Sequence, residues 1–230
     1  MEQQFEQTLT SVYDFTLVLP EVTWTHRWLY EILEQIPIET NSLIDVGCGR
    51  GIIGALARIY RNPKRLVGVD VFRPYLNFCS CHSLYDELYN HDLTKTPLFF
   101  RDKEFDVATC IEVLEHIPKS DGEKLLNELE RIAKKVIITT PNGLLPQKPL
   151  DGNPFQRHVS YWSVKDFTKR GYTVKGVGYF TIFGRKLRYI SFLLSRFSYA
   201  IPTCSDALLA YKQCNERTQN NNFHFKQQKF

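Results

Sequence analysis

Apolar residues follow two alternating patterns along the chain. Short continuous runs have the length of buried strands, and the stretches between them place apolar residues at every third or fourth position, as amphipathic helices do. Strands that alternate with helices form a doubly wound, mostly parallel sheet. The pattern predicts strands at 43–47, 65–70, 87–90, 105–111, 136–140, 172–179 and 207–211, and helices that include 51–60 and 163–170.

The first helical pattern precedes the first strand. Trp24, Trp28 and Ile32 mark its apolar face, and Pro37 ends it. Such a helix covers the sheet, and an alternative role is to close over a ligand.

The pattern along the chain predicts three parts: a helical cap (1–40), one globular domain (41–214) and a polar, disordered tail (215–230).

A glycine-rich turn follows the first strand. Gly47, Gly49 and Gly51 stand at every second position after Asp45, and a helical pattern starts at Ile52. Glycine reaches positive φ and lets the backbone approach a ligand closely. A strand, glycine loop and helix in this order indicate a nucleotide-type ligand at the carboxyl end of a parallel sheet. The dinucleotide fingerprint would need a third glycine at position 52, so another ligand is indicated.

Asp70 closes the second strand, nineteen residues after Gly51. A carboxylate at this place can accept two hydrogen bonds from a ribose diol. The glycine spacing together with Asp70 resembles motif I of the class I S-adenosylmethionine-dependent methyltransferases. The resemblance implies an α/β fold, namely a Rossmann-like doubly wound sheet of seven strands, mostly parallel with an antiparallel last strand.

The same resemblance implies a set of cofactor contacts. The methionine portion and ribose edge would lie against Asp45 and the three glycines, and Asp92 would meet the adenine amino group. Cys110 and Ile111 would flank the methionine end through their backbone. The full set of cofactor-binding residues is Asp45, Gly47, Cys48, Gly49, Gly51, Asp70, Val71, Asp92, Leu93, Cys110 and Ile111.

A second polar group follows the fourth strand. If the chain turns helical there, Glu112, Glu115 and His116 share one face, because they stand at positions i, i+3 and i+4. With His158 they could form an oxygen and nitrogen site for Mg²⁺ or Mn²⁺. Such a metal would lower the pKa of an acceptor hydroxyl.

This E-x-x-E-H pattern resembles the ubiquinone-biosynthesis O-methyltransferases and the small-RNA 3′-terminal 2′-O-methyltransferases. An alternative is that these residues shape the active-site loop without a metal. In that case His158 or His116, beside Glu115, would act as a general base for a hydroxyl acceptor. A purely structural role for either histidine is the third alternative.

Composition and charge indicate which class of acceptor the protein uses. The net charge is only +4, with basic and acidic residues interspersed, so a nucleic-acid partner is disfavoured. We therefore expect an enzyme that methylates a small molecule, at a hydroxyl oxygen. The alternatives are an RNA 3′-terminal 2′-O-methyltransferase and a regulatory S-adenosylmethionine-binding module without turnover.

The remaining sequence features indicate where in the cell the protein acts. The 184–204 stretch predicts a helical insertion that packs on the sheet; its basic residues also suit peripheral membrane contact through 184–200 or a phosphate-bearing acceptor. From the residues given we expect no signal peptide and no membrane-spanning run, and the six cysteines lack paired CxxC spacing. We therefore expect a cytoplasmic protein with reduced thiols.

Overall fold

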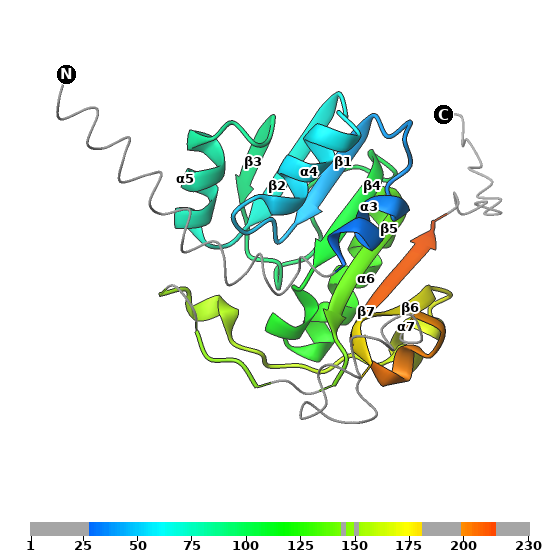
Figure 1. Cartoon of the computed structure of the whole chain (residues 1–230). Helices are drawn as coiled ribbons and strands as arrows, with labels where there is room; N and C mark the ends of the chain where they lie inside the picture. The colour runs from blue at the N-terminus through cyan, green and yellow to red at the C-terminus, as the bar shows by residue number, and fades with distance from the viewer. Residues whose placement is uncertain (1–27, 144–145, 150–151, 181–198, 215–230) are drawn as a thin grey trace, which may run out of the picture.

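The computed structural model describes residues 28–143, 146–149, 152–180 and 199–214 (Figure 1). The first five strands along the chain run parallel to one another, whereas the last strand runs antiparallel to both of its neighbours. This topology confirms the predicted seven-stranded, mostly parallel sheet. Its spatial order is β3 (Glu87–Asn90), β2 (Arg65–Asp70), β1 (Ser42–Val46), β4 (Phe105–Ile111), β5 (Ala133–Pro141), β7 (Ser205–Gln213) and β6 (Thr173–Phe180).

Helices cover both faces of the sheet (Figure 1). Successive strand residues point to opposite faces, so Leu43 packs with the helices of one face and Ile44 with those of the other. Burial on both faces is the reason that the strands read as continuous apolar runs. One face carries α3 (Leu29–Gln35), α4 (Ile52–Tyr60) and α5 (Arg73–Cys81), and the other carries α6 (Lys119–Ile132) and α7 (Val164–Thr168).

The predicted elements agree with these bounds to within about three residues, the usual uncertainty at element ends. The first helix confirms its sheet-covering role, because Trp28 and Ile32 are buried against sheet residues. Three short 3₁₀ helices complete the described structure: η1 (Leu114–His116), η2 (Pro154–Gln156) and η4 (Pro202–Cys204).

Several expectations fall outside the described residues. Trp24, the tail from 215 and most of the 184–204 insertion lie there, so the proposed lid and membrane contact remain predictions. Among the described helices, none has the length and apolar character needed to cross a membrane.

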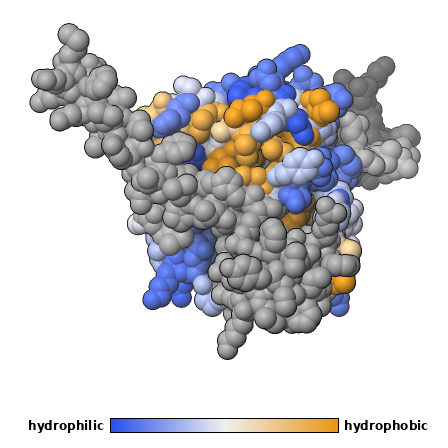
Figure 2. Space-filling view, in the orientation of Figure 1, coloured by the Kyte–Doolittle hydropathy of each residue, from blue (hydrophilic) through white to orange (hydrophobic). Residues whose placement is uncertain are grey.

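Apolar side chains also reach the surface. Figure 2 shows them gathered over α4, where Ile59 is 71% exposed, and Ile38 beyond α3 is 75% exposed. Ile53 and Ala57 of the same helix are buried in the core. Helix α4 is therefore apolar on its outer side as well as toward the sheet.

Candidate functional site

The glycine turn lies at the carboxyl end of β1. Gly47, Gly49 and Gly51 all have positive φ, at 77°, 52° and 83°. The amides of Gly47 and Cys48 both donate to the carbonyl of Val69, which fixes the turn against β2. Helix α4 starts directly after Gly51, so the turn is shaped as the sequence predicts.

Gly47 is also required by packing. A Cβ at this position would lie 2.3 Å from Cγ2 of Val113, which follows β4. The glycine turn after β1 therefore touches the loop that carries the E-x-x-E-H residues. Two predicted sites, separated by more than sixty positions in sequence, meet at one edge of the sheet.

Asp70 stands beside this turn, at the end of β2. Its carboxylate accepts hydrogen bonds from the amide of Gly49 at 2.9 Å and from the amide of Phe72 at 2.8 Å. Burial raises the pKa of the Asp70 carboxyl, and the two amides oppose that rise. Val71, next along the chain, accepts a hydrogen bond at its carbonyl from Asn90.

Asp45 lies beneath the turn rather than on its surface. One carboxylate oxygen accepts a hydrogen bond from the hydroxyl of Tyr85 and the other from Thr109, each at 2.7 Å. Burial raises the pKa of Asp45 to about 6, although both hydroxyl donors act to lower it. The sequence analysis missed Tyr85 and Thr109. Three glycines pack against the Tyr85 ring, and they are the signal in the sequence that could have pointed to the tyrosine.

The remaining predicted cofactor residues lie at the ends of β3 and β4. Asp92 follows β3 and accepts two hydrogen bonds from Thr94, at its amide and its hydroxyl, which forms a tight turn. Leu93 and Cys110 are buried, and Ile111 is half-buried at the end of β4. All of them lie at the carboxyl edge of the sheet, where the resemblance requires them.

The structure corrects the expectation that the chain turns helical directly after β4. Glu112 adopts a left-handed backbone with φ of 56°, and only Leu114–His116 form one turn of 3₁₀ helix. Glu112 therefore does not share a helical face with Glu115 and His116. The backbone turns here because the Glu112 amide bonds the Thr139 carbonyl of β5, and Val113 packs against Gly47.

Three of the four predicted metal ligands nevertheless come together. One potential ligand atom each of Glu115, His116 and His158 lies within 4.8 Å of the other two. Glu112 is not part of this group, but its carboxylate is close enough to affect the pKa of Glu115. We refer to Glu115, His116 and His158 as the ligand triad.

The polar contacts of the triad orient its atoms. Thr140 donates a hydrogen bond to one Glu115 oxygen at 3.1 Å, and the other oxygen, Oε1, is buried with no hydrogen-bond partner and lies 4.0 Å from Nε2 of His116. Nδ1 of His116 lies 3.3 Å from the Arg157 carbonyl. A carbonyl only accepts, so Nδ1 carries the proton and Nε2 keeps its lone pair.

The electrostatics of the triad follow from burial. Burial and the His158 imidazole lower the pKa of His116 to about 4, so this ring is neutral at pH 7. Burial, followed by the Glu112 carboxylate, raises the pKa of Glu115 well above its ordinary value. A buried carboxyl group beside a neutral imidazole is suited to bind a cation or to exchange a proton.

An extended strap, residues 157–162, brings His158 to the triad. The amides of Val159 and Ser160 donate to the Glu115 carbonyl, and the Trp162 indole donates to the Leu114 carbonyl. The strap is thus hydrogen-bonded directly to η1. Sequence spacing could not predict this pairing, because it joins segments more than forty residues apart.

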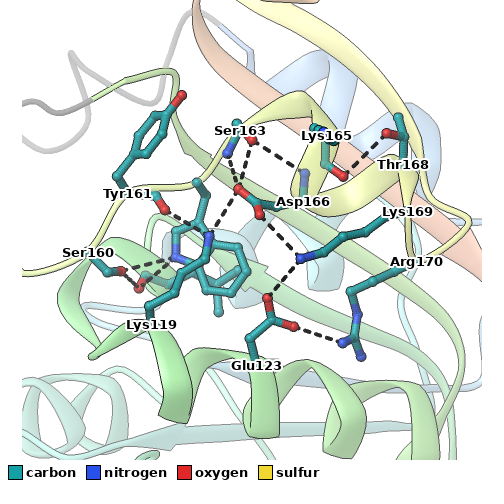
Figure 3. A network of polar contacts seen from close by, with 12 residues as sticks. Lys119, Glu123, Ser160, Tyr161, Ser163, Lys165, Asp166, Thr168, Lys169 and Arg170 are labelled. Carbon is teal, nitrogen blue, oxygen red and sulfur yellow. Dashed lines mark hydrogen bonds and ion pairs between the residues drawn. The ribbon is translucent and has the colours of Figure 1, made fainter.

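Charged residues of α6, of α7 and of the two positions after α7 form a network at the end of the strap (Figure 3). Lys119 donates to the Tyr161 carbonyl at 2.8 Å, pairs with Asp166 at 3.0 Å and lies over the Trp162 ring. Arg170 and Lys169 both pair with Glu123 of α6. The network fixes α7 to α6, and the strap between them.

Comparison with known proteins agrees with this geometry. Residues 44–136 match a family described as a methyltransferase domain. Over 93 residues the chain is 34% identical to the ubiquinone biosynthesis O-methyltransferase of Hydrogenovibrio crunogenus, covering 38% of this chain and 37% of that protein. The enzyme of the same name from Coxiella burnetii is 28% identical over 117 residues, 48% of each chain. The chain thus aligns with less than half of the length of these curated relatives.

Solved structures resemble the whole described fold. The DhpI-SAH complex structure has a TM-score of 0.60 at 15% identity, covering 93% of this chain and 95% of that one. The methyltransferase domain of bacterial CtHen1-CN has a TM-score of 0.55 at 21% identity, covering 81% of this chain and 97% of that one. At these identities the likeness establishes the fold.

Proposed function

Because this chain belongs to the class I S-adenosylmethionine-dependent methyltransferase family, we propose that it transfers a methyl group to a hydroxyl oxygen of a small-molecule acceptor. The observation that carries the proposal is the contact of the glycine turn with the loop before the ligand triad, through Gly47 and Val113. A cofactor on the turn would present its methyl group beside that loop.

The cofactor would rest on the three glycines, with its ribose hydroxyls on Asp70. The two amides that bond Asp70 already orient its carboxylate toward the turn. Methyl transfer from a sulfonium is an in-line displacement with a good leaving group, so positioning of the two reactants supplies much of the rate. The buried strand ends provide a rigid base for that positioning.

The acceptor would lie against the ligand triad. His116 is neutral with its Nε2 lone pair available, and Glu115 places a buried oxygen without a hydrogen bond toward it. These donors fit a divalent cation such as Mg²⁺ or Mn²⁺, held by Glu115, His116 and His158. When bound, such an ion lowers the pKa of an acceptor hydroxyl.

Without a metal, the proton of the acceptor hydroxyl would pass to His158. His116 is a weak base, because a group with a pKa of about 4 holds a proton poorly at neutral pH. Glu115 and the Arg157 carbonyl would then keep the His116 ring in place.

Oxygen is favoured as the acceptor atom because the curated relatives are ubiquinone biosynthesis O-methyltransferases. A small-molecule acceptor is favoured over RNA because the net charge is only +4. We infer no specific acceptor from the relatives, since they align over less than half of their length.

The test is to incubate the protein with methyl-labelled S-adenosylmethionine, Mg²⁺ and an extract of its own host. The control is the Asp70→Ala variant, which should transfer less label than the wild type at the same cofactor concentration. Label in the solvent-extractable fraction supports the proposal and provides a product to identify by mass. Label in RNA or protein overturns the small-molecule acceptor, and cofactor binding without any label would favour a regulatory module.

A further inference from the structure

Two buried carboxylates lie on neighbouring strands under the proposed cofactor site. Asp45 lies one residue before the end of β1, Asp70 ends β2, and both residues are almost fully buried. Hydroxyl groups and backbone amides satisfy them, and neither forms an ion pair with any basic side chain in the described residues. The described protein therefore places negative charge here without a cation of its own.

Tyr85 contacts Asp45, the more buried of these two residues. Its ring packs beneath the glycine turn, so closely that a Cβ on Gly54 would lie 2.3 Å from it and a Cβ on Gly51 or Gly68 would lie 3.1 Å from it. Its hydroxyl donates to Asp45 at 2.7 Å. The three glycines leave room for a full tyrosine ring whose only polar atom reaches the carboxylate.

We propose that Tyr85 is a positioning residue that keeps Asp45 ionised beneath the glycine turn, and that this charge makes the site prefer cationic S-adenosylmethionine to neutral S-adenosylhomocysteine. Thr109, on the other oxygen of Asp45, has the same role from β4. The inference rests on the proposed function, because it assumes that the turn binds this cofactor.

The chemistry of the two ligands gives the reason. S-adenosylmethionine carries a sulfonium charge, and transfer of the methyl group converts it to an uncharged thioether. An attraction between that cation and a carboxylate is stronger in a buried site than in water, because the effective dielectric is lower. The product therefore loses an attraction that the substrate had, which favours its release and the binding of fresh cofactor.

The charge of Asp45 depends on its surroundings. Burial raises its pKa to about 6, the hydroxyls of Tyr85 and Thr109 lower it, and the Asp70 carboxylate raises it. The other titratable groups that face it are the thiols of Cys48 and Cys110. A hydrogen bond with Cys79 and then burial raise the pKa of the Cys48 thiol, and burial raises that of the Cys110 thiol, so both are uncharged near neutral pH. Burial raises the pKa of Asp70 as well. The Tyr85 hydroxyl bonds Asp45, so a Tyr85→Phe variant reports on the titration of Asp45.

The test compares the affinity of both ligands by calorimetry between about pH 5 and about pH 8. In the wild type, the affinity ratio of S-adenosylmethionine to S-adenosylhomocysteine should fall as acid protonates Asp45. In Tyr85→Phe the midpoint of that fall should move up by about one pH unit, because the carboxylate has lost a donor. A merely structural role of the ring would lower both affinities together and leave the midpoint in place.

The matched control is Tyr89→Phe, which also removes a tyrosine hydroxyl bonded to a carboxylate, that of Glu87 on β3. It should behave as the wild type. Thr109→Val is measured in parallel and should shift the pH midpoint of the affinity ratio in the same direction. This second variant keeps the test valid if Tyr85→Phe fails to fold.

Three results would overturn the inference: an unchanged ratio and midpoint in both Tyr85→Phe and Thr109→Val, an equal shift in Tyr89→Phe, or a wild-type ratio that does not change with pH. If the wild type binds neither ligand, the proposed function itself is wrong.

Discussion

The carboxylate of Asp70 accepts a hydrogen bond from the backbone amide of Gly49, at 2.9 Å. This contact joins the end of the second strand to the middle of the glycine turn. A single side chain therefore shapes the turn and would supply the acceptor that a ribose diol needs. The two features that mark the proposed cofactor site in the sequence are one physical unit in the fold.

Replacing Asp70 with alanine should weaken S-adenosylmethionine binding by about 1–3 kcal/mol, the size expected for the loss of hydrogen bonds to a charged group. Titration calorimetry gives the affinity directly. Asp70→Asn is the matched variant, since it keeps an oxygen for the Gly49 amide and removes the charge. Unchanged affinity in Asp70→Ala would refute the assignment of this residue.

Gly47→Ala should destabilise the protein more than Gly49→Ala. Both residues have positive φ, which costs a side chain about 1–2 kcal/mol. Only at Gly47 would the new Cβ clash, 2.3 Å from Val113, whereas nothing lies within 4 Å of a Cβ on Gly49. Overpacking adds about 1–3 kcal/mol, so urea unfolding should rank the variants in this order. Equal free energies of unfolding would contradict the described contact between the two loops.

Removing divalent metal should abolish turnover and leave cofactor binding intact, because the proposed cofactor site is on the glycine turn and the ligand triad is outside it. Glu115→Gln should lower turnover at least about tenfold, the loss expected when a metal site is disturbed. Glu112→Gln is its control, since Glu112 is outside the triad, and it should lose less activity. Full activity in a chelator would exclude a catalytic metal at this site.

Asp166→Asn should reduce stability at neutral pH and not in acid. Partial burial acts to raise the pKa of Asp166, but hydrogen bonds from Ser163 and Lys119 outweigh it and lower the pKa to about 2. The stabilisation is therefore complete above the unfolded-state pKa of about 4 and is lost as pH falls toward about 2. After allowance for solvent screening we expect a difference of about 1–2 kcal/mol near pH 6.

Urea unfolding of wild type and Asp166→Asn at about pH 6 and about pH 2.5 measures this change. Asp121→Asn removes an ion pair with Lys124 that lies on the outside of α6, and it should cost less than about 0.5 kcal/mol. If the wild type and Asp166→Asn differ in free energy of unfolding by the same amount at both pH values, the charge of Asp166 does not hold the strap.

Local patterns were sufficient for most of the framework. The strand 105–111 and the weak strand 87–90 were predicted with the bounds that the structure has, because each is a short run closed by polar residues. The positive φ of the three glycines followed from their spacing. Backbone preferences of this kind depend on neighbours in sequence, so the sequence contains them.

The loop after β4 shows where local reasoning fails. Helical spacing placed Glu112 on one face with Glu115, yet Glu112 is left-handed and η1 is a single turn. The cause is not local: Gly47, in the turn after β1, and Thr139 of β5 fix the path of the backbone there. Contacts with these distant segments decided against the helix.

The sequence by itself determined the parallel sheet, the glycine turn and the residue types of the ligand triad, because periodicity and glycine spacing act over a few residues. Only the tertiary structure decided that Glu112 is outside the triad, that the strap brings His158 to it, and that Tyr85 lies under Asp45. Those pairings join positions forty or more residues apart. The burial that shifts the pKa values of Asp45 and His116 likewise arises only when the sheet and its helices close around them.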